Sequence, residues 1–381
     1  MVDMKDTFNL CIVKPNKSTF SETFIQAHID RLEGNKKVLY GGDFPLYDHE
    51  GKFLIRSKVS LLAYLVQKRI FKKKEIGVRI RALSAYLKEN KIDVVLAEYG
   101  MVGAMIASAC KMAGVPLIIH FHGADAHHKP TIAKYLPLYR VAFDYASAIV
   151  AVSNDMVTAL KKMDAPASKI HLNPYGVDGA KFPLTDILNS GPSFLSVGRF
   201  VEKKSPQSVI RAFMQVHLGF PEAHLWMVGD GPLFDNTKQL ISELGLTDSV
   251  TLTGVMTSAE IRALMGKVRC FVQHSVTAAD GDMEGTPNTI LEAASAGLAI
   301  VSTAHAGIKE AVIDSVTGFL VAEHDIDNMA AKMRRIADDV ELAAKMGLAA
   351  HDHIVKNYDI NKRIALLDHI IQSSISNNKI R

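Results

Sequence analysis

The sequence predicts an α/β protein with two doubly wound parallel-sheet domains. Short runs rich in β-branched residues are each followed by a turn and an amphipathic helix, an alternation typical of parallel sheets with helices on both faces. The chain has 381 residues, enough for two or three domains at about 150 residues each. A stretch rich in Pro and Gly at residues 173–179, followed by polar residues up to 192, separates two sets of such units.

The first set of strands begins at residues 9–14, and a helix is expected over 20–32. The further strands of this set are expected at residues 37–40, 93–97, 116–121, 148–152 and 169–172. The second set is expected at residues 193–197, 224–228, 249–252, 270–273, 299–302 and 318–321. We therefore expect an N-terminal domain over residues 1–178, a C-terminal domain over 179–360, and a final helix within 361–381 that packs back on the N-terminal domain.

Composition excludes several classes of protein. The residues are 48% hydrophobic and 22% charged, so the chain is not globally disordered. Cys11, Cys110 and Cys270 lie too far apart in sequence for a Cys-x-x-Cys site, and their odd number excludes a complete disulfide framework. The first residues carry acids and no long apolar run, and no stretch reaches about 18 apolar residues. We expect a cytoplasmic protein with no secretory signal.

The charge is unevenly distributed. The net charge of +4 is too small for a dedicated nucleic-acid-binding protein, so no nucleic-acid partner is expected. Residues 52–91 nevertheless carry twelve basic and two acidic side chains, a local balance of +10, which leaves −6 for the rest of the chain. Within this segment, helical spacing predicts one buried face formed by Val59, Leu62, Val66 and Ile70.

Two interpretations of the basic segment remain open. It is either a solvated helix face or a patch that holds the protein peripherally at the anionic inner face of a membrane. The basic residues of that patch would be Lys68, Arg69, Lys72, Lys73 and Lys74.

The motif Glu284-Gly-Thr-Pro-Asn-Thr-Ile-Leu-Glu292 predicts an anion-binding helix start. Pro287 is suited to the first turn of a helix that runs to about Ala296, whose first amides would face a ligand beyond the strand ends. Glu292 lies among apolar residues, where a carboxylate is costly unless it is paired, and a vicinal diol such as a ribose could pair with it. Alternatively, Glu284 only favours the helix start, and Glu292 reaches solvent or pairs with a lysine.

The motif Val197-Gly-Arg199 followed by Lys204 predicts a cationic site. Arg199 falls at the carboxyl end of a predicted strand, where open α/β sheets bind ligands, and Lys204 follows on the loop. A guanidinium and an ammonium together suit a diphosphate without a metal. Lys203 is expected to face solvent, and an ordinary basic turn is the alternative.

The segment His120-Phe-His122-Gly-Ala-Asp125 places histidines at another strand end. His122 should lie at the strand tip facing a cleft, with Asp125 able to orient it. His127 and His128 add to the cluster, but the spacing matches no zinc pattern and we expect no metal.

Two further loops are weaker candidates. Asp280-Gly-Asp282 has an Asp-x-Asp pattern that could hold a divalent metal with a diphosphate, although a mobile polar loop is favoured. Gly229-Asp-Gly-Pro232 is favoured as a tight strand-to-helix turn.

Taken together, these motifs resemble the retaining family-4 glycosyltransferases of the GT-B fold. The resemblance spans most of the chain, and its most specific part combines Arg199 and Lys204 with Glu284-x7-Glu292. The family's glycine pair in the first loop is absent, and Lys204-Ser205 replaces its usual Lys-Gly. The first loop instead resembles a subgroup that makes bacterial surface polysaccharides.

The resemblance implies roles for individual residues. Catalytic roles fall to His122, Arg199, Lys204 and Glu284, with His122 touching the transferred sugar and the two cations holding the diphosphate. Glu292 would bind the ribose hydroxyls. The other implied donor-binding residues are Gly285, Thr286, Pro287, Asn288, Thr253, Gly254 and Val255, and the acceptor-side residues are Ser21, Glu22 and Asp125.

The implied activity is transfer of a hexose-type sugar, with retention, from a nucleoside diphosphate donor. A UDP-sugar is favoured and a GDP-sugar is the alternative. The acceptor would be a saccharide or lipid-linked saccharide in polysaccharide synthesis, with neither cofactor nor metal. The competing hypotheses are a nucleotide-sugar epimerase on the same fold and a non-catalytic nucleotide-sugar-binding subunit.

Overall fold

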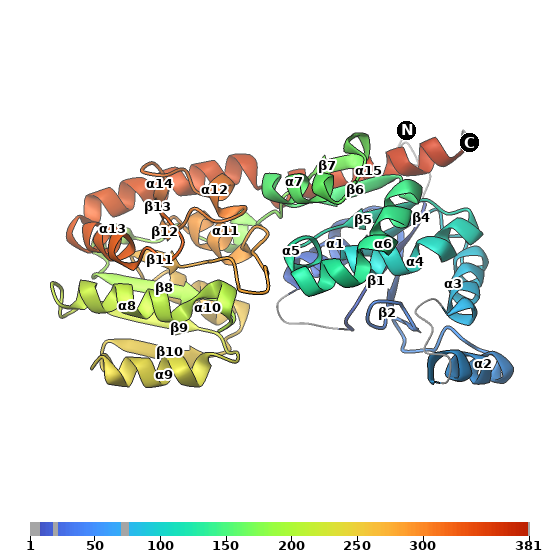
Figure 1. Ribbon diagram of the computed structural model, residues 1–381. Coiled ribbons are helices and arrows are strands. Elements are labelled where there is room, and N and C mark those ends of the chain that lie inside the picture. Colours follow the sequence, from blue (N-terminus) through green and yellow to red (C-terminus); the bar gives the residue numbers. More distant parts are fainter. Residues whose placement is uncertain (1–7, 18–21, 70–75, 380–381) are drawn as a thin grey trace, which may run out of the picture. The chain divides into compact units, whose positions relative to one another are not determined.

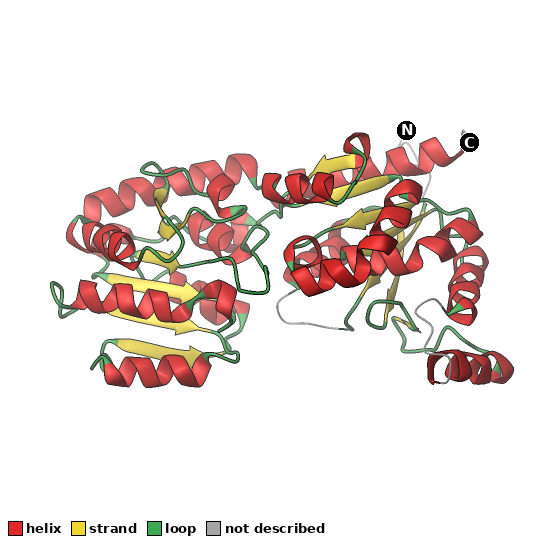
Figure 2. Ribbon diagram, in the orientation of Figure 1, coloured by secondary structure: helices red, strands yellow, loops and turns green. Residues whose placement is uncertain are grey.

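The computed structural model describes residues 8–17, 22–69 and 76–379. The chain divides into two compact units, one formed by Met1–Asn173 with Ile364–Arg381 and the other by Pro174–Arg363. Each unit is a parallel sheet with helices packed against it, so the predicted α/β class is confirmed (Figures 1 and 2). The domain boundaries expected after residues 178 and 360 lie within a few residues of this division.

The N-terminal unit holds a seven-stranded sheet in the order β3-β2-β1-β4-β5-β6-β7. Its strands are β1 (Asn9–Lys14), β2 (Asn35–Tyr40), β3 (Tyr47–Asp48), β4 (Val94–Glu98), β5 (Leu117–His120), β6 (Ala148–Ala151) and β7 (Ile170–Leu172). All neighbours pair in parallel except β2 and β3. Strand β3 was not predicted, because its two residues are too few for a periodic signal.

The helices of this unit connect the parallel strands. They are α1 (Thr23–Arg31), α2 (Lys58–Arg69), α3 (Gly77–Glu89), α4 (Gly100–Ala113), α5 (Ala124–His127), α6 (Lys129–Tyr145) and α7 (Asn154–Lys162), with a short η1 (Ala167–Lys169). Helix α4 begins directly after β4, against the end of β5. A Cβ at Gly100 would lie 2.1 Å from Cε1 of Phe121, so only glycine allows this close start.

The C-terminal unit holds a six-stranded, fully parallel sheet in the order β10-β9-β8-β11-β12-β13. Its strands are β8 (Ser193–Val197), β9 (His224–Val228), β10 (Val250–Gly254), β11 (Cys270–Gln273), β12 (Ala299–Thr303) and β13 (Gly318–Val321). Its helices are η2 (Gly179–Lys181), η3 (Ile187–Asn189), η4 (Glu202–Lys204), α8 (Pro206–His217), α9 (Phe234–Glu243), α10 (Ser258–Met265), α11 (Asn288–Ser295), α12 (Ile308–Ala311), α13 (Ile326–Asp338) and α14 (Val340–Asn357).

The segment expected to be a linker packs onto the C-terminal unit. Val177 pairs with Asp359 in a β-bridge, and the N–H of Thr185 donates to the carbonyl of Ala296 over 2.8 Å. Phe182 and Ile187 are buried. The Pro and Gly residues that suggested a linker therefore precede an ordered, partly apolar segment, whose few large side chains determine its packing.

The last helix, α15 (Ile360–Lys379), contributes its residues from Ile364 onward to the N-terminal unit. Asp368 accepts a hydrogen bond from the backbone N–H of Glu33 over 3.0 Å, and Gln372 donates to the Glu33 carboxylate over 2.8 Å. Asn378 donates to the carbonyl of Gly114 over 3.1 Å. These bonds link the end of the chain to the segments after α1 and α4.

Helix α2 does not bury the face that its spacing predicted. Val59 is 78% exposed and Leu62 is 64% exposed, whereas Tyr64 is 5% exposed. Tyr64 packs in a small apolar cluster with Ile55 and Val78. A single large aromatic side chain thus determines which face of α2 is covered, against the spacing of the aliphatic residues.

Parts of the basic segment lie outside the described residues. These parts include Ile70, Lys72, Lys73 and Lys74, and the structure does not describe the side chain of Arg69. Over the part of the chain that is described, no helix combines the length and apolar character needed to cross a membrane.

Candidate active site

Three glycine loops meet at the carboxyl ends of β8, β9 and β10. A Cβ at Gly229 would lie 2.0 Å from the carbonyl oxygen of Gly198, and the backbone of Gly229 has φ +133°. The N–H of Gly229 donates to the carbonyl of Gly254 over 2.8 Å. The segment Gly229-Asp-Gly-Pro232 is therefore a close-packed turn between neighbouring loops, where a side chain would not fit.

The backbone at the end of β10 is already used within the protein. Both the N–H of Gly229 and the hydroxyl of Thr253 donate to the carbonyl of Gly254. Val255, the next residue, is 63% exposed. The structure thus places the three residues expected near the base beside the glycine loops.

Lys204 and Glu284 form the ionic centre of this edge. The Nζ atom of Lys204 lies 3.3 Å from Oε2 of Glu284, and both side chains are largely buried. A Cβ at Gly198 would lie 3.3 Å from Cε of Lys204, so glycine leaves room for the lysine to pass. Burial lowers the pKa of Lys204 despite the neighbouring carboxylate. A second anion would therefore stabilise this ammonium further.

Only one carboxylate oxygen of Glu284 has a partner among the described residues. Burial alone would raise the pKa of Glu284, but the charges of Lys204 and Lys203 lower it below its usual value. The Oε1 atom of Glu284 is buried and has no hydrogen-bond partner among the described residues. A buried, unpartnered carboxylate oxygen beside a lysine indicates a place where a ligand hydroxyl would bind.

The backbone of Glu284 is held by residues that the sequence analysis missed. Its N–H donates to Nε2 of His305 over 3.2 Å, and Nδ1 of His305 lies 2.6 Å from the Glu323 carboxylate. The His305 ring must therefore donate through Nδ1 and accept through Nε2. No motif connects the three residues in sequence, because they meet only through the folding of β12 and β13.

Lys203 corrects an expectation. It was expected to face solvent, but its Nζ lies 3.0 Å from Oδ2 of Asp282 and 3.2 Å from the carbonyl oxygen of Met283. Its side chain is 13% exposed. The carboxylate of Asp280 accepts the N–H of Asp282. The loop before Glu284 is thus held against η4 by an ion pair.

Glu292 lies on α11, and no described side chain forms a hydrogen bond or ion pair with it. It is half-buried, and the described residues offer it no hydrogen bond or ion pair, so the lysine pairing considered above is absent among them. Burial raises the pKa of Glu292 to about 7, and Arg262 opposes that rise only partly. A ligand that donates two hydrogen bonds to this buried carboxylate would therefore stabilise its ionised form.

Helix α11 starts one residue later than expected. Pro287 has ψ 115° and is the N-cap, and Asn288 is the first helical residue. The N–H of Gly307 donates to the carbonyl of Gly285 over 3.0 Å, and a Cβ at Gly307 would lie 2.5 Å from that oxygen. Gly285 and Thr286 are therefore packed against the loop before α12.

Arg199 is exposed at the same edge. It belongs to a pocket at the carboxyl ends of β8 and β9 whose lining also includes Lys204. The lining residues are Ser196, Val197, Gly198, Arg199, Phe200, Lys204, Pro206, Met227, Val228 and Gln273. The structure thus brings the two predicted cations to one pocket.

In the N-terminal unit, His122 follows β5 and is held differently from what the sequence suggested. Asp125 accepts hydrogen bonds from the backbone N–H groups of Gly100, His122 and Gly123, and so fixes the backbone of the turn. The His122 ring is held by Glu98, whose Oε2 lies 2.8 Å from Nε2. The sequence analysis missed Glu98, because a single acid at the end of an apolar strand has no local signal.

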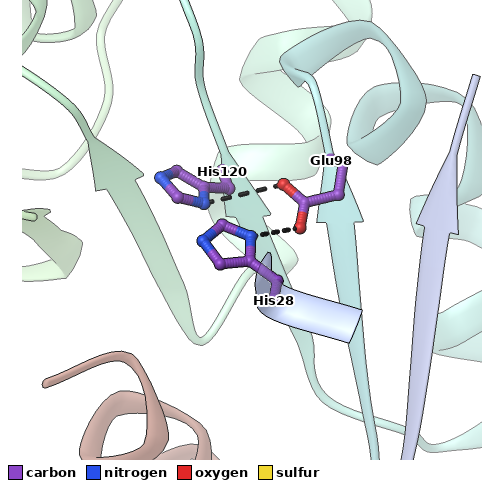
Figure 3. Close-up of side chains that lie close together, drawn as sticks. All are labelled: His28, Glu98 and His120. Carbon is purple, nitrogen blue, oxygen red and sulfur yellow. Dashed lines mark hydrogen bonds and ion pairs between the residues drawn. The ribbon is translucent and has the colours of Figure 1, made fainter. Parts of the chain in front are cut away.

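Glu98 is the centre of a buried cluster of histidines (Figure 3). Its Oε1 lies 2.8 Å from Nδ1 of His28, and its Oε2 lies 3.6 Å from Nδ1 of His120. Neither ring nitrogen of His120 has a hydrogen-bond partner in the described part of the chain. Burial lowers the pKa of His120 well below its usual value, so this ring is neutral.

His28, Glu98 and His120 have the residue types of a metal site, and their nearest ligand atoms lie within 4.8 Å of one another. The two 2.8 Å contacts of Glu98 are, however, of hydrogen-bond length and attach to different oxygens. These two contacts are those of a carboxylate that accepts hydrogen bonds from the rings of His28 and His122.

On the acceptor side, Glu22 accepts hydrogen bonds from Asn16 and from the Tyr99 hydroxyl. Ser21 lies outside the described residues. Of the residues expected to contact an acceptor, the structure therefore describes Glu22 and Asp125 but not Ser21.

Two family models match this chain. Residues 185–353 match the family described as "Glycosyl transferases group 1", and residues 51–181 match "Glycosyltransferase Family 4". The amylovoran biosynthesis glycosyltransferase AmsK of Erwinia amylovora is 30% identical over 287 residues, which cover 74% of this chain and 70% of AmsK. The putative colanic acid biosynthesis glycosyltransferase WcaL of Salmonella typhimurium is 28% identical, covering 72% of this chain and 70% of WcaL.

The fold is also found in solved structures. Anabaena HepE, solved in complex with UDP and glucose, has a TM-score of 0.75 at 17% identity, covering 96% of this chain and 100% of HepE. Sucrose-phosphate synthase of Thermosynechococcus elongatus has a TM-score of 0.75 at 16% identity, covering 97% of this chain and 100% of that protein. The chain belongs to the family-4 glycosyltransferases of the GT-B fold, as its sequence motifs implied.

Proposed function

We propose that this glycosyltransferase moves a hexose-type sugar, with retention, from a nucleoside diphosphate donor to a saccharide or lipid-linked saccharide in exopolysaccharide synthesis. The proposal is supported by two carboxylates at one edge of one sheet that lack hydrogen-bond partners among the described residues: the Oε1 atom of Glu284, beside Lys204, and the side chain of Glu292. The similarity to AmsK and WcaL supports an exopolysaccharide as the polymer that is made. A UDP-sugar is the favoured donor.

The reaction breaks the bond between the sugar C1 and the diphosphate oxygen and forms a bond from C1 to an acceptor oxygen. Negative charge grows on the leaving diphosphate, and Lys204, Arg199 and the first amides of α11 stabilise it. The acceptor attacks on the face that the diphosphate leaves, and the leaving phosphate oxygen takes the acceptor's proton. This path retains the configuration at C1 and needs no covalent nucleophile.

Glu284 and Glu292 have distinct roles in the proposal. The free Oε1 of Glu284 accepts a hydrogen bond from a sugar hydroxyl, while its other oxygen keeps Lys204 in place. Glu292, once ionised, accepts both ribose hydroxyls. Because these bonds orient the donor before reaction, they contribute to the rate as well as to affinity.

The test is incubation of the protein with a panel of radiolabelled UDP- and GDP-sugars and extracted glycolipid acceptors. We expect transfer of label from one donor, with slow release of the nucleoside diphosphate when no acceptor is present. Interconversion of the free donor would identify an epimerase. Binding without turnover of any donor would identify a binding subunit.

We also propose that the N-terminal unit docks on an anionic membrane through α2. Exposed Val59 and Leu62 lie on the same helix as Lys58 and Lys68, so apolar side chains and ammonium groups are available together. Each basic residue near an anionic surface contributes about 1 kcal/mol, and an inserted apolar side chain adds to that. A surface-bound enzyme would meet a lipid-linked acceptor directly.

Sedimentation with vesicles tests this docking. We expect binding to anionic vesicles, little binding to neutral vesicles, and release by high salt. The variant Lys68→Glu/Lys72→Glu/Lys73→Glu/Lys74→Glu should lose binding while it keeps donor hydrolysis, and Leu62→Ser should weaken binding. Equal binding to both vesicle types, or to neither, contradicts the proposal.

A further inference from the structure

Glu98 and His28 have no role in the activity described so far. Glu98 ends β4, is fully buried, and contacts His28 and His122 through different oxygens, each at 2.8 Å. His28 comes from α1, and His122 follows β5. Three separate elements thus converge on one carboxylate, and no described lysine or arginine forms an ion pair with it.

The charge of Glu98 determines which ring nitrogens of His28 and His122 carry protons. Burial alone would raise the pKa of Glu98, but His28 and His122 together lower it well below its usual range. An ionised carboxylate only accepts hydrogen bonds. Nδ1 of His28 and Nε2 of His122 must therefore both be N–H donors.

The His122 ring is also fixed by packing. The ring of Phe24 lies 4.6 Å from it between centroids, and the Tyr99 ring lies 4.7 Å away in an edge-on arrangement. Asp125 holds the backbone of the same residue. Rotation of the imidazole by half a turn would place a carbon atom against Glu98 and break a charge-assisted bond in a dry environment.

We propose that Glu98 and His28 are positioning residues for His122. Glu98 accepts a hydrogen bond from Nε2 and so fixes both the orientation of the imidazole and the position of its proton on that nitrogen. His28 holds the second carboxylate oxygen and prevents Glu98 from turning. This inference rests on the proposed glycosyl transfer and on the role that the family resemblance implies for His122, contact with the transferred sugar.

Three variants separate positioning from general stability. Glu98→Gln keeps the shape of the side chain, but its amide can donate to one ring and accept from the other, so it no longer requires a proton on both nitrogens. His28→Asn keeps an N–H donor near the position of Nδ1, whereas His28→Leu removes it. His120→Leu is the control, because His120 is also buried and its ring packs against His122, but its ring nitrogens have no hydrogen-bond partner among the described residues.

Kinetics provide the first measurement. In Glu98→Gln we expect kcat for transfer to fall on the order of 100-fold, while the donor KM changes little, since misplacing one group by about 1 Å has an effect of this size. In His28→Leu we expect a similar fall in kcat. In His28→Asn most of the kcat of the unmodified protein should be kept. His120→Leu should keep the kcat of the unmodified protein.

The ring nitrogens provide a second measurement that does not depend on turnover. Long-range proton–nitrogen spectra of the protein labelled at histidine should show His122 protonated at Nε2, and a mixture of ring forms in Glu98→Gln. If the unmodified protein turns over no donor but the spectra change as expected, the proposed function fails and the positioning stands.

Three results would overturn the inference. The first is an unchanged kcat with an unchanged His122 spectrum in Glu98→Gln. The second is an equal loss of kcat in His120→Leu, which would mean that any change in this core is harmful. The third is a stoichiometric metal ion in the purified protein, found by elemental analysis and lost in Glu98→Gln, because the cluster would then bind a metal and not hold a proton.

Discussion

Glu98 and Glu284 are both buried carboxylates near strand ends, but their surroundings differ. Both oxygens of Glu98 contact histidine nitrogens, whereas Glu284 contacts Lys204 through one oxygen, and its other oxygen has no hydrogen-bond partner among the described residues. A satisfied carboxylate positions its neighbours. An unsatisfied one retains binding capacity, so the difference indicates which cluster holds a ligand and which supports the protein's own residues.

The largest expected effect is on stability, and it distinguishes the two carboxylates. Glu98→Ala should lower the free energy of unfolding by about 2–6 kcal/mol, because it leaves the N–H groups of two buried histidines without an acceptor and each costs about 1–3 kcal/mol. Glu284→Ala should lower it by about 1 kcal/mol, because Lys204 keeps some access to water.

Urea unfolding measures both changes. Circular dichroism follows both units, and fluorescence of Trp226, the single tryptophan, follows β9 in the C-terminal unit. The Glu98→Ala shift should be seen in the dichroism first. A cost for Glu284→Ala as large as that for Glu98→Ala would remove the distinction between the two sites.

The next effect concerns catalysis at the unsatisfied site. Lys204→Ala and Arg199→Ala should each raise the barrier to transfer by about 2–4 kcal/mol, because each leaves the growing charge of the diphosphate without a cation. Steady-state kinetics with the best donor measure this loss, and Lys267→Ala, an exposed lysine of the same unit, is the matched control. Turnover close to that of the unmodified protein would exclude the substituted residue from the mechanism.

The sequence predicted the edge of the C-terminal sheet better than the interior of the N-terminal unit. Strands β8, β9, β11 and β13 have the expected bounds, and the predicted pocket residues Arg199 and Lys204 lie on one loop. Such residues are found from sequence because they follow one strand directly. Glu98 was missed because its partner His28 lies 70 positions away and shares no motif with it.

The face of α2 shows a second limit of sequence patterns. The spacing of Val59 and Leu62 predicted burial, but the structure exposes them and buries Tyr64. Periodicity identifies an apolar stripe, and only the neighbouring segments decide whether it is covered. Here Ile55, Ile76 and Val78 form a cluster with the aromatic side of the helix.

A smaller effect is expected in the pH dependence of donor binding. The pKa of Glu292 is about 7 in the folded protein, so its ionised fraction rises roughly tenfold between pH 6 and pH 8. Affinity for a nucleotide sugar, whose diphosphate does not titrate in this range, should rise by up to about tenfold. Calorimetric titration measures it, and Glu292→Gln should abolish the dependence. An equally steep profile in that variant would assign the titration to another group.

Stability should change in the opposite direction at the same residue. The folded-state pKa of Glu292 is raised, so its protonated carboxyl favours the folded state. This contribution to the free energy of unfolding is fully present below the unfolded pKa of about 4.5 and is lost as pH rises through about 7. Glu292→Gln should therefore be relatively more stable above pH 7 than below pH 5.

The smallest effect, no change at all, is expected on removal of divalent metals. We predict that transfer survives EDTA, since Lys204, Arg199 and the start of α11 already oppose the charge of the diphosphate. The alternative ligands are occupied, because Asp282 pairs with Lys203 at 3.0 Å and Asp280 accepts the N–H of Asp282. Loss of activity that Mg²⁺ or Mn²⁺ restores would assign Asp280 and Asp282 as ligands. Loss that only Zn²⁺ restores would instead indicate His28, Glu98 and His120, and the satisfied carboxylate would then be a metal ligand.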